Sequence, residues 1–361
     1  MDTLAGMPSS RVRKEVSAAL HAFVDRQRPG MLAISDDLAP ALAALDALLA
    51  EGKRLRPAFC YWGWRGAGGA DRPELVAAAA SLELLQASAL VHDDVMDASD
   101  TRRGQPSVHR RFQAMHEDAG WPGAAESFGS GAAILLGDLC LAWSGEMYDT
   151  SGLDQETLRR GRPIYDLMRT EVMCGQYLDL LEQARGTAVP GAGTVATALR
   201  VVEFKSAKYT IERPLHLGAA LAGADDRTLA ALSAYGLPLG IAFQLRDDVL
   251  GVFGDPVETG KPAGDDLREG KRTVLVALAL ERATPAQAEV VRTRLGDPAL
   301  DPAGVADLRS IIVDTGALAA CEAMIDRYAA DAHTALGSAP VTAEARVALT
   351  ELAVAATARH S

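Results

Sequence analysis

An apolar segment that ends in three closely spaced carboxylates constrains this chain more than any other feature. Residues 90–97 read LVHDDVMD, so Asp93, Asp94 and Asp97 follow directly on apolar residues. In a helix, Asp97 lies one turn beyond the other two, and all three can point into one space. Carboxylates this close repel each other unless a cation intervenes, and Mg²⁺ prefers oxygen ligands that it bridges to phosphates. The pattern indicates a helix ending at a metal–phosphate site, with a solvated acidic helix end as the alternative.

A second segment, far along the chain, repeats this plan. Residues 243–251 read FQLRDDVLG, so Asp247 and Asp248 end another apolar run, with Gln244 one turn before them on the same helix face. Only the fold can bring together two clusters so distant in sequence. Two facing carboxylate pairs would clamp a metal–diphosphate from both sides, which favours a site over two unrelated acidic helix ends.

Basic residues near these segments could bind phosphate oxygens through charge-assisted hydrogen bonds. Arg102 and Arg103 follow the first cluster, whereas Lys53 and Arg56 flank the start of a predicted helix, where anions are favoured. Taken without the rest of the chain, the segment around Lys53 is better interpreted as a solvated basic turn than as a phosphate site. Lys205 lies in an otherwise apolar stretch and is either a snorkelling surface residue or an inward phosphate ligand.

The remaining pattern is that of an all-α protein. In few stretches do apolar residues alternate with period two, as they would in strands. Hydrophobic residues make up 48% of the chain and aromatic residues only 5%, a composition that suits closely packed helices. We predict one domain over residues 1–361, because no segment has the composition of a linker. The charged stretch 99–119 is predicted to be a mobile loop, and 255–272 a flexible loop that closes over a ligand. Helices are predicted at 11–27, 36–51, 123–149, 154–184 and 194–223, in the segment leading to Asp97, and over most of 273–361.

The net charge and the cysteine content indicate what kind of partner and what compartment this protein has. The net charge of −12 argues against general nucleic-acid binding. The four cysteines have no metal-ligand spacing and read as reduced core residues of a cytoplasmic protein. The N-terminus lacks a signal pattern, and no uncharged run is long enough for a transmembrane helix, so we expect no transmembrane segment.

In these motifs the chain resembles the trans-isoprenyl diphosphate synthases of the polyprenyl synthetase family. The resemblance rests on the first aspartate cluster with its Arg102-Arg103-Gly104 tail, and on the second cluster with Gly254-Asp255-Pro256 and Gly260-Lys261 after it. It implies a single bundle of antiparallel helices around a central cavity, a homodimer, and Mg²⁺-dependent condensation of isopentenyl diphosphate with an allylic diphosphate. Within that family, the chain resembles the geranylgeranyl diphosphate synthases most.

The resemblance also implies a role for each matching residue. Three Mg²⁺ ions would be held by Asp93, Asp97 and Asp247, with Asp94 and Asp248 binding metal-coordinated water. The residues lining the allylic diphosphate would be Arg102, Gln176, Lys205, Gln244 and Lys261, and Ser206 would also bind substrate. Those near isopentenyl diphosphate would be Lys53, Arg56, Gln86, Arg103 and Phe243, and Lys271 would belong to the closing loop.

One residue departs from the family pattern. The second motif ends in Gly251, where many members carry a third aspartate. Because that aspartate acts through water in the family, we expect activity to survive with an altered metal dependence. Gly251 would be the first position to revert to aspartate if the protein consumed no isopentenyl diphosphate.

Small residues before the first cluster predict the product length. Ser88 and Ala89 lie one turn before Asp93, where bulky aromatics stop the chain at fifteen carbons in the family. We therefore predict a tunnel with Leu84 and Leu85 as its floor and a twenty-carbon product, with longer products as the nearest alternative. In the alternative interpretation, Ser88 and Ala89 are merely close-packing residues.

Two other functions compete with this one. A class I terpene cyclase also uses an aspartate-rich helix and Mg²⁺, but it has no role for Lys53, Arg56 and Arg103. A catalytically silent partner subunit of a heteromeric synthase would show no turnover alone. A di-metal oxidase is disfavoured, because the sequence has no Glu-x-x-His pair.

Overall fold

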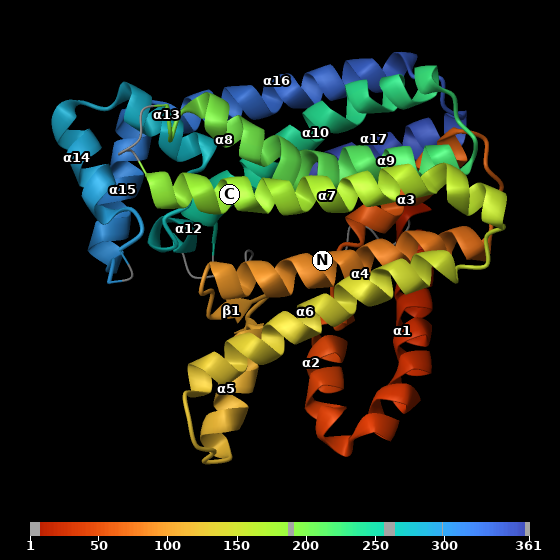
Figure 1. Cartoon of the computed structure of the whole chain (residues 1–361). Helices are drawn as coiled ribbons and strands as arrows, with labels where there is room; N and C mark the ends of the chain where they lie inside the picture. Colours follow the sequence, from red (N-terminus) through yellow and green to blue (C-terminus); the bar gives the residue numbers. More distant parts are fainter. Residues whose placement is uncertain (1–7, 187–190, 256–263, 298, 358–361) are drawn as a thin grey trace. The chain divides into compact units, whose positions relative to one another are not determined.

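The structure is a computed structural model that describes residues 8–186, 191–255, 264–297 and 299–357. These residues are almost entirely helical, which confirms the predicted all-α class (Figure 1). The chain divides into two compact units, one of residues 1–162 and 217–224, the other of residues 163–216 and 225–361. The single domain over residues 1–361 stays a prediction.

The first unit is built around α4, which ends at the first aspartate cluster. Helix α4 packs along α6, and α1 and α3 also lie against α4 (Figure 1). Its buried face is made largely of alanine and leucine, whose compact side chains let neighbouring helices approach closely. The helices of this unit are α1 (Pro8–Ile34), the short 3₁₀ turn η1 (Asp36–Leu38), α2 (Ala39–Ala50), α3 (Leu55–Gly66), α4 (Pro73–Met96), α5 (Val108–Asp118), α6 (Ala125–Asp149), the start of α7 (Gln155–Arg185) and the end of α9 (Arg213–Leu221).

The second unit is built around α10, which carries the second aspartate cluster. Helix α10 packs against α16 and against η2, an 11-residue π-helical segment (Figure 1). The helices of this unit are the rest of α7, α8 (Val195–Val201), η2 (Val202–Glu212), the start of α9, α10 (Asp226–Phe253), α12 (Asp265–Arg268), α13 (Val274–Arg282), α14 (Pro285–Arg294), α15 (Pro302–Asp314), α16 (Ala317–Ser338) and α17 (Ala343–Thr357).

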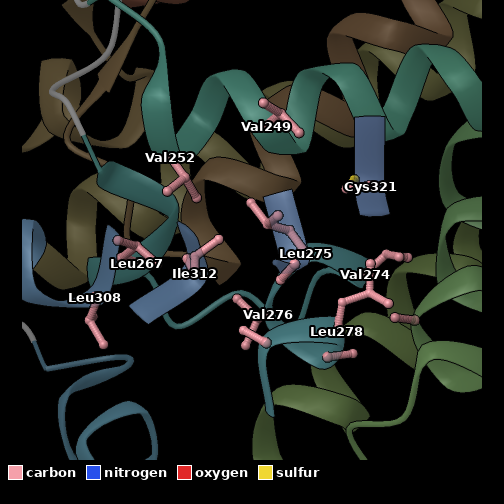
Figure 2. Packing of buried hydrophobic residues seen from close by; sticks show 14 of the residues in the cluster. Val249, Val252, Leu267, Val274, Leu275, Val276, Leu278, Leu308, Ile312 and Cys321 are labelled. Atoms are coloured by element: carbon pink, nitrogen blue, oxygen red, sulfur yellow. The ribbon is translucent and has the colours of Figure 1, made fainter. Parts of the chain in front are cut away.

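A buried apolar cluster fixes the C-terminal end of α10. Val249 and Val252 of α10 pack with Leu267 of α12, Leu275 of α13 and Ile312 of α15 (Figure 2). Burial of such side chains stabilises the fold by about 1.5–3 kcal/mol each. The cluster therefore holds the short helix α12 beside the end of α10, and so sets the surroundings of the second aspartate pair.

Two of the predicted segments are wrong in detail. The stretch 99–119 is ordered rather than a mobile loop: it forms a two-stranded hairpin, β1 (Thr101–Arg102) and β2 (Gln105–Pro106), followed by α5. The predicted helix 194–223 is confirmed as a continuous helical run formed by α8, η2 and α9, and its middle part, η2, is π-helical. Such π-helices are rare, and they often occur at functional sites. In the predicted loop 255–272, residues 265–268 form α12, and 256–263 lie outside the described residues.

Within the part of the chain that the structure describes, three helices are long and apolar enough to cross a membrane by length and composition alone, namely α4, α6 and α10. In α4, 72% of the most apolar stretch is buried inside the protein, so internal packing accounts for its composition. The corresponding shares are 39% in α6 and 44% in α10. The absence of a transmembrane segment therefore stays a prediction.

Candidate active site

The first aspartate cluster lies at the C-terminal end of α4. Asp94 is buried, and Asp93 is 18% exposed. Asp97 is the residue that caps the helix, and its backbone N–H donates to the Asp93 carbonyl at 2.8 Å. The helix therefore ends within the cluster, as the sequence predicts.

The hairpin after α4 brings the two arginines back to this region. Strands β1 and β2 pair Arg102 with Gln105, and the two residues between them, Arg103 and Gly104, have positive φ angles of 54° and 71°. This is the geometry of a tight hairpin turn, which favours glycine at its second position. Arg102 donates to Asp94 through Nε at 3.0 Å and through Nη2, so its guanidinium lies against the first aspartate cluster.

A second group of cations in the same unit surrounds the start of α3. Lys53 is exposed and Arg56 is half-buried. Arg103 donates to the Glu51 carbonyl, and to that of Leu48 at 3.3 Å. These contacts hold the hairpin tip against the segment that carries Lys53.

Gln86 of α4 has the character of a ligand-binding side chain. Its Oε1 atom is buried and accepts no hydrogen bond from the residues that the structure describes. Leaving a buried acceptor unsatisfied costs about 1–3 kcal/mol, so such an atom points to a missing donor.

The chain-length residues all lie on the α4 segment that precedes Asp93. Leu84, Leu85 and Ser88 are buried, and Ala89 is half-buried. The helix therefore presents small side chains one turn before the aspartates and large ones a turn deeper, in the order that the sequence predicts.

The second aspartate cluster lies near the C-terminal end of α10. Gln244 donates to Asp248 at 2.7 Å and accepts from Ser206 of η2. Burial raises the pKa of Asp248 to about 7, helped by the nearby negative charges of Asp266 and Asp247, and the hydrogen bond from Gln244 acts against this. A neighbouring cation would lower the pKa of this carboxyl and favour its charged form.

Asp266 of α12 occupies the space next to Gly251. A Cβ atom built on Gly251 would lie 1.9 Å from Oδ2 of Asp266, so a side chain at residue 251 requires the Asp266 carboxylate to move. Lys271 donates to Asp266 at 3.3 Å and forms an ion pair with Glu269 at 2.7 Å. The position at which many family members carry a third aspartate is thus filled from another element.

The π-helix η2 positions Lys205. Its ammonium donates to Asp179 of α7 at 2.6 Å, and both side chains are largely buried. Lys205 is therefore only partly exposed, and its ammonium is held by a buried carboxylate. Gln176 lies one turn before Asp179 on α7 and is half-buried, whereas Phe243 of α10 is buried.

The donors present fit Mg²⁺ bound together with a phosphate rather than a closed protein cage. Among the described residues, no group of three or more histidine, cysteine, aspartate or glutamate side chains is arranged to hold a metal ion. Mg²⁺ keeps several waters and is usually bound through one or two carboxylates plus substrate phosphates, and each aspartate cluster offers carboxylates of this kind.

The structure thus brings most of the predicted residues into two groups, one in each unit. The first comprises Lys53, Arg56, Gln86, Asp93, Asp94, Asp97, Arg102 and Arg103, and the second Gln176, Lys205, Ser206, Phe243, Gln244, Asp247, Asp248 and Lys271. Lys261 lies outside the described residues. The roles of all these residues stay predictions.

Three residues that contact or adjoin these groups were not predicted from the sequence: Arg54, Glu83 and Asp266. Arg54 and Glu83 form a buried ion pair 2.7 Å long. A glutamate within the apolar run before Gln86 is the signal that could have found this pair, because buried charges are almost always paired.

Comparison with known proteins supports the motifs. The family model described as polyprenyl synthetase matches residues 40–312. The geranylfarnesyl diphosphate synthase of Aeropyrum pernix is 34% identical over 309 residues, which cover 84% of this chain and 89% of that protein. The geranylgeranyl diphosphate synthase of Mycobacterium tuberculosis is 36% identical over 66% of this chain and 62% of that protein.

A solved structure shares the fold over nearly the whole chain. The geranylgeranyl pyrophosphate synthase of Corynebacterium glutamicum, solved in complex with isoprenyl diphosphate and magnesium, is 42% identical to this chain with a TM-score of 0.92. The match covers 97% of this chain and 99% of that one.

Proposed function

The chain belongs to the polyprenyl synthetase family of trans-prenyltransferases, and on that premise we propose that it makes geranylgeranyl diphosphate. The reaction would condense isopentenyl diphosphate with allylic diphosphates up to a twenty-carbon product. The observation that carries the product length is the pair of small residues, Ser88 and Ala89, one turn before Asp93 on α4. Because one relative makes geranylfarnesyl diphosphate, a twenty-five-carbon product is the alternative.

In the proposed mechanism, the chain's own residues hold two diphosphates and exclude water. Asp93, Asp97 and Asp247 would hold three Mg²⁺ ions, which when bound draw negative charge onto the departing diphosphate. Arg102, Lys205 and Gln244 would orient the allylic diphosphate, and Lys53, Arg56 and Arg103 that of isopentenyl diphosphate. The allylic carbocation left by diphosphate departure is attacked by the double bond of isopentenyl diphosphate. A proton then passes to the released diphosphate, and water must be excluded until that point.

The first experiment is a product-length assay. Purified protein with Mg²⁺ receives isopentenyl diphosphate and each of the five-, ten- and fifteen-carbon allylic diphosphates. A twenty-carbon product supports both the reaction and the tunnel, whereas a fifteen-carbon product would contradict the tunnel alone. No consumption of isopentenyl diphosphate with any starter would contradict the proposal and favour a cyclase or a silent partner subunit.

Replacing Ser88 by phenylalanine should shorten the product to fifteen carbons. Ser88 is 4% exposed, so a ring at this position would fill the space one turn before Asp93. Chromatography of the dephosphorylated products measures the change. The matched control is Ser81→Ala, a buried serine two turns earlier on α4, which should leave the product length unchanged. An unchanged twenty-carbon product from Ser88→Phe would place the tunnel elsewhere.

We propose further that the protein works as a cytoplasmic homodimer, which the family resemblance supports. On α6, Leu135 is 70% exposed and Ile134 is 45% exposed, and association of two copies would cover such apolar surface. Sedimentation of the wild type should give the mass of a dimer, and Leu135→Lys should shift it toward that of a monomer. A monomeric wild type would contradict the proposal.

A further inference from the structure

A buried ion pair holds the segment that carries Lys53 and Arg56. The Nη1 atom of Arg54 lies 2.7 Å from Oε2 of Glu83, and these side chains are only 3% and 6% exposed. Arg54 also donates to Ser17 through Nε at 3.2 Å and to the Leu49 carbonyl through Nη2. One inward-pointing guanidinium therefore joins three elements, α1, α4 and the end of α2.

The backbone of this segment is in an unusual conformation. Arg54 has φ 53° and ψ 37°, in the left-handed region that few non-glycine residues adopt. Such a conformation persists only where surrounding contacts determine it, and it is common at ligand-binding sites. Arg54 turns its side chain inward, whereas its neighbour Lys53 is exposed and Arg56 is half-buried.

The same pair lies beside the other candidate ligands for a diphosphate. Glu83 lies one helical turn before Gln86 on α4, whose Oε1 is without a donor among the described residues. A Cβ atom built on Gly52 would lie 3.1 Å from Nη1 of Arg54 and 3.6 Å from Nη2 of Arg103. Two guanidiniums therefore meet at Gly52, and Glu83 compensates the charge of the buried one.

We propose that the Arg54–Glu83 pair is a positioning device for the diphosphate of isopentenyl diphosphate. It sets the backbone so that Lys53, Arg56 and Arg103 converge near Gln86, without touching the substrate itself. A buried ion pair contributes little more stability than apolar residues of similar volume, so a geometric role accounts better for its presence. This inference rests on the proposed function.

The test separates positioning from folding. In the double variant Arg54→Met/Glu83→Leu, apolar side chains of similar volume replace the pair, so the fold is retained while the constraint is lost. The affinity for isopentenyl diphosphate, measured by calorimetry, should fall about 10- to 100-fold, as for groups that orient ligands. The KM for isopentenyl diphosphate should rise with it, and the KM for the allylic substrate should stay within about twofold of the wild type. Arg54→Lys keeps the charge but not the forked geometry, so its affinity for isopentenyl diphosphate should lie between those of the wild type and the double variant.

The matched control removes another ion pair of the same unit. Arg28 of α1 donates to both carboxylate oxygens of Asp46 of α2, at 3.0 and 2.9 Å. Arg28→Met/Asp46→Leu should leave the affinity for isopentenyl diphosphate unchanged. If the Arg54→Met/Glu83→Leu variant instead lowers only the melting temperature and keeps the wild-type affinity, the pair is structural and the inference is wrong.

The calorimetric measurement also distinguishes this inference from the proposed function. A wild type that binds isopentenyl diphosphate without turnover would contradict the proposed function, while weaker binding by the double variant would still support the positioning role. A wild type that does not bind isopentenyl diphosphate at all would overturn both.

Discussion

Replacing Asp93 by asparagine should lower kcat/KM for the allylic substrate by about 10²–10³-fold, the usual cost of losing one group that stabilises charge in the transition state. The substitution keeps the size of the side chain but removes the charge that we propose holds Mg²⁺ against the leaving diphosphate. Asp93 is 18% exposed, and its ion pair with Arg102 is long, at 3.6 Å. The melting temperature should therefore change little, which separates a catalytic loss from unfolding.

The control for this variant is a neighbouring carboxylate outside the cluster. Asp100 is 77% exposed and accepts a hydrogen bond from Arg110 at 2.8 Å. Asp100→Asn makes the same chemical change within the same part of the chain and should leave kcat/KM unchanged. Steady-state kinetics over a range of Mg²⁺ concentrations measures both variants. Equal activity of Asp93→Asn and the wild type would remove Asp93 from the proposed metal ligands.

The sequence predicts the helices and the two aspartate clusters well, because both depend on local periodicity. Asp93, Asp94, Asp247 and Asp248 lie at the ends of long apolar runs, and the structure has those runs as α4 and α10. The motif residues are also recognisable by resemblance, since their spacing within each segment is short.

The contacts between distant segments could not be predicted in this way. Arg54 reads as one more cation of a basic turn, and only the fold reveals that it turns inward to Glu83 on another helix. The charged residues around Arg102 predict a mobile loop. The hairpin turn in the structure depends on two positive φ angles, which charge and hydropathy do not reveal. The π-helical segment around Lys205 carries no signal in the sequence that distinguishes it from an ordinary α-helix.

Gly251 is the clearest case in which the structure changes an expectation. From the sequence, this glycine is a missing aspartate that could be restored. In the structure, the carboxylate of Asp266 fills the space where the side chain of residue 251 would lie. The neighbouring Leu267 is 1% exposed and belongs to the apolar cluster shared with α10, so α12 cannot easily move away (Figure 2). The glycine and Asp266 are therefore a matched pair.

Gly251→Asp should consequently destabilise the protein rather than improve it. Forcing a side chain into a filled space costs about 1–3 kcal/mol, and the new carboxylate would also repel Asp266 and the buried Asp248. Gly251→Ala tests the steric part alone and should also lower stability, measured by denaturant unfolding. The matched control is Gly337→Ala on α16, where a Cβ atom meets nothing within 4 Å. Because Gly337 lies near the end of α16, replacing it should stabilise the protein only slightly, which is a change of the opposite sign.

The double variant Gly251→Asp/Asp266→Ser should recover most of the lost stability, because it moves the carboxylate from α12 to α10 without crowding. If the cost of Gly251→Asp comes instead from the loss of glycine itself, Gly251→Ala and Gly337→Ala should change stability alike, and Asp266→Ser should rescue nothing. Turnover of isopentenyl diphosphate by the double variant then tells whether one carboxylate at this place is enough for the reaction. Wild-type turnover would mean that either element can supply it. Loss of turnover in a stable double variant would mean that the reaction needs Asp266 itself, where Lys271 pairs with it.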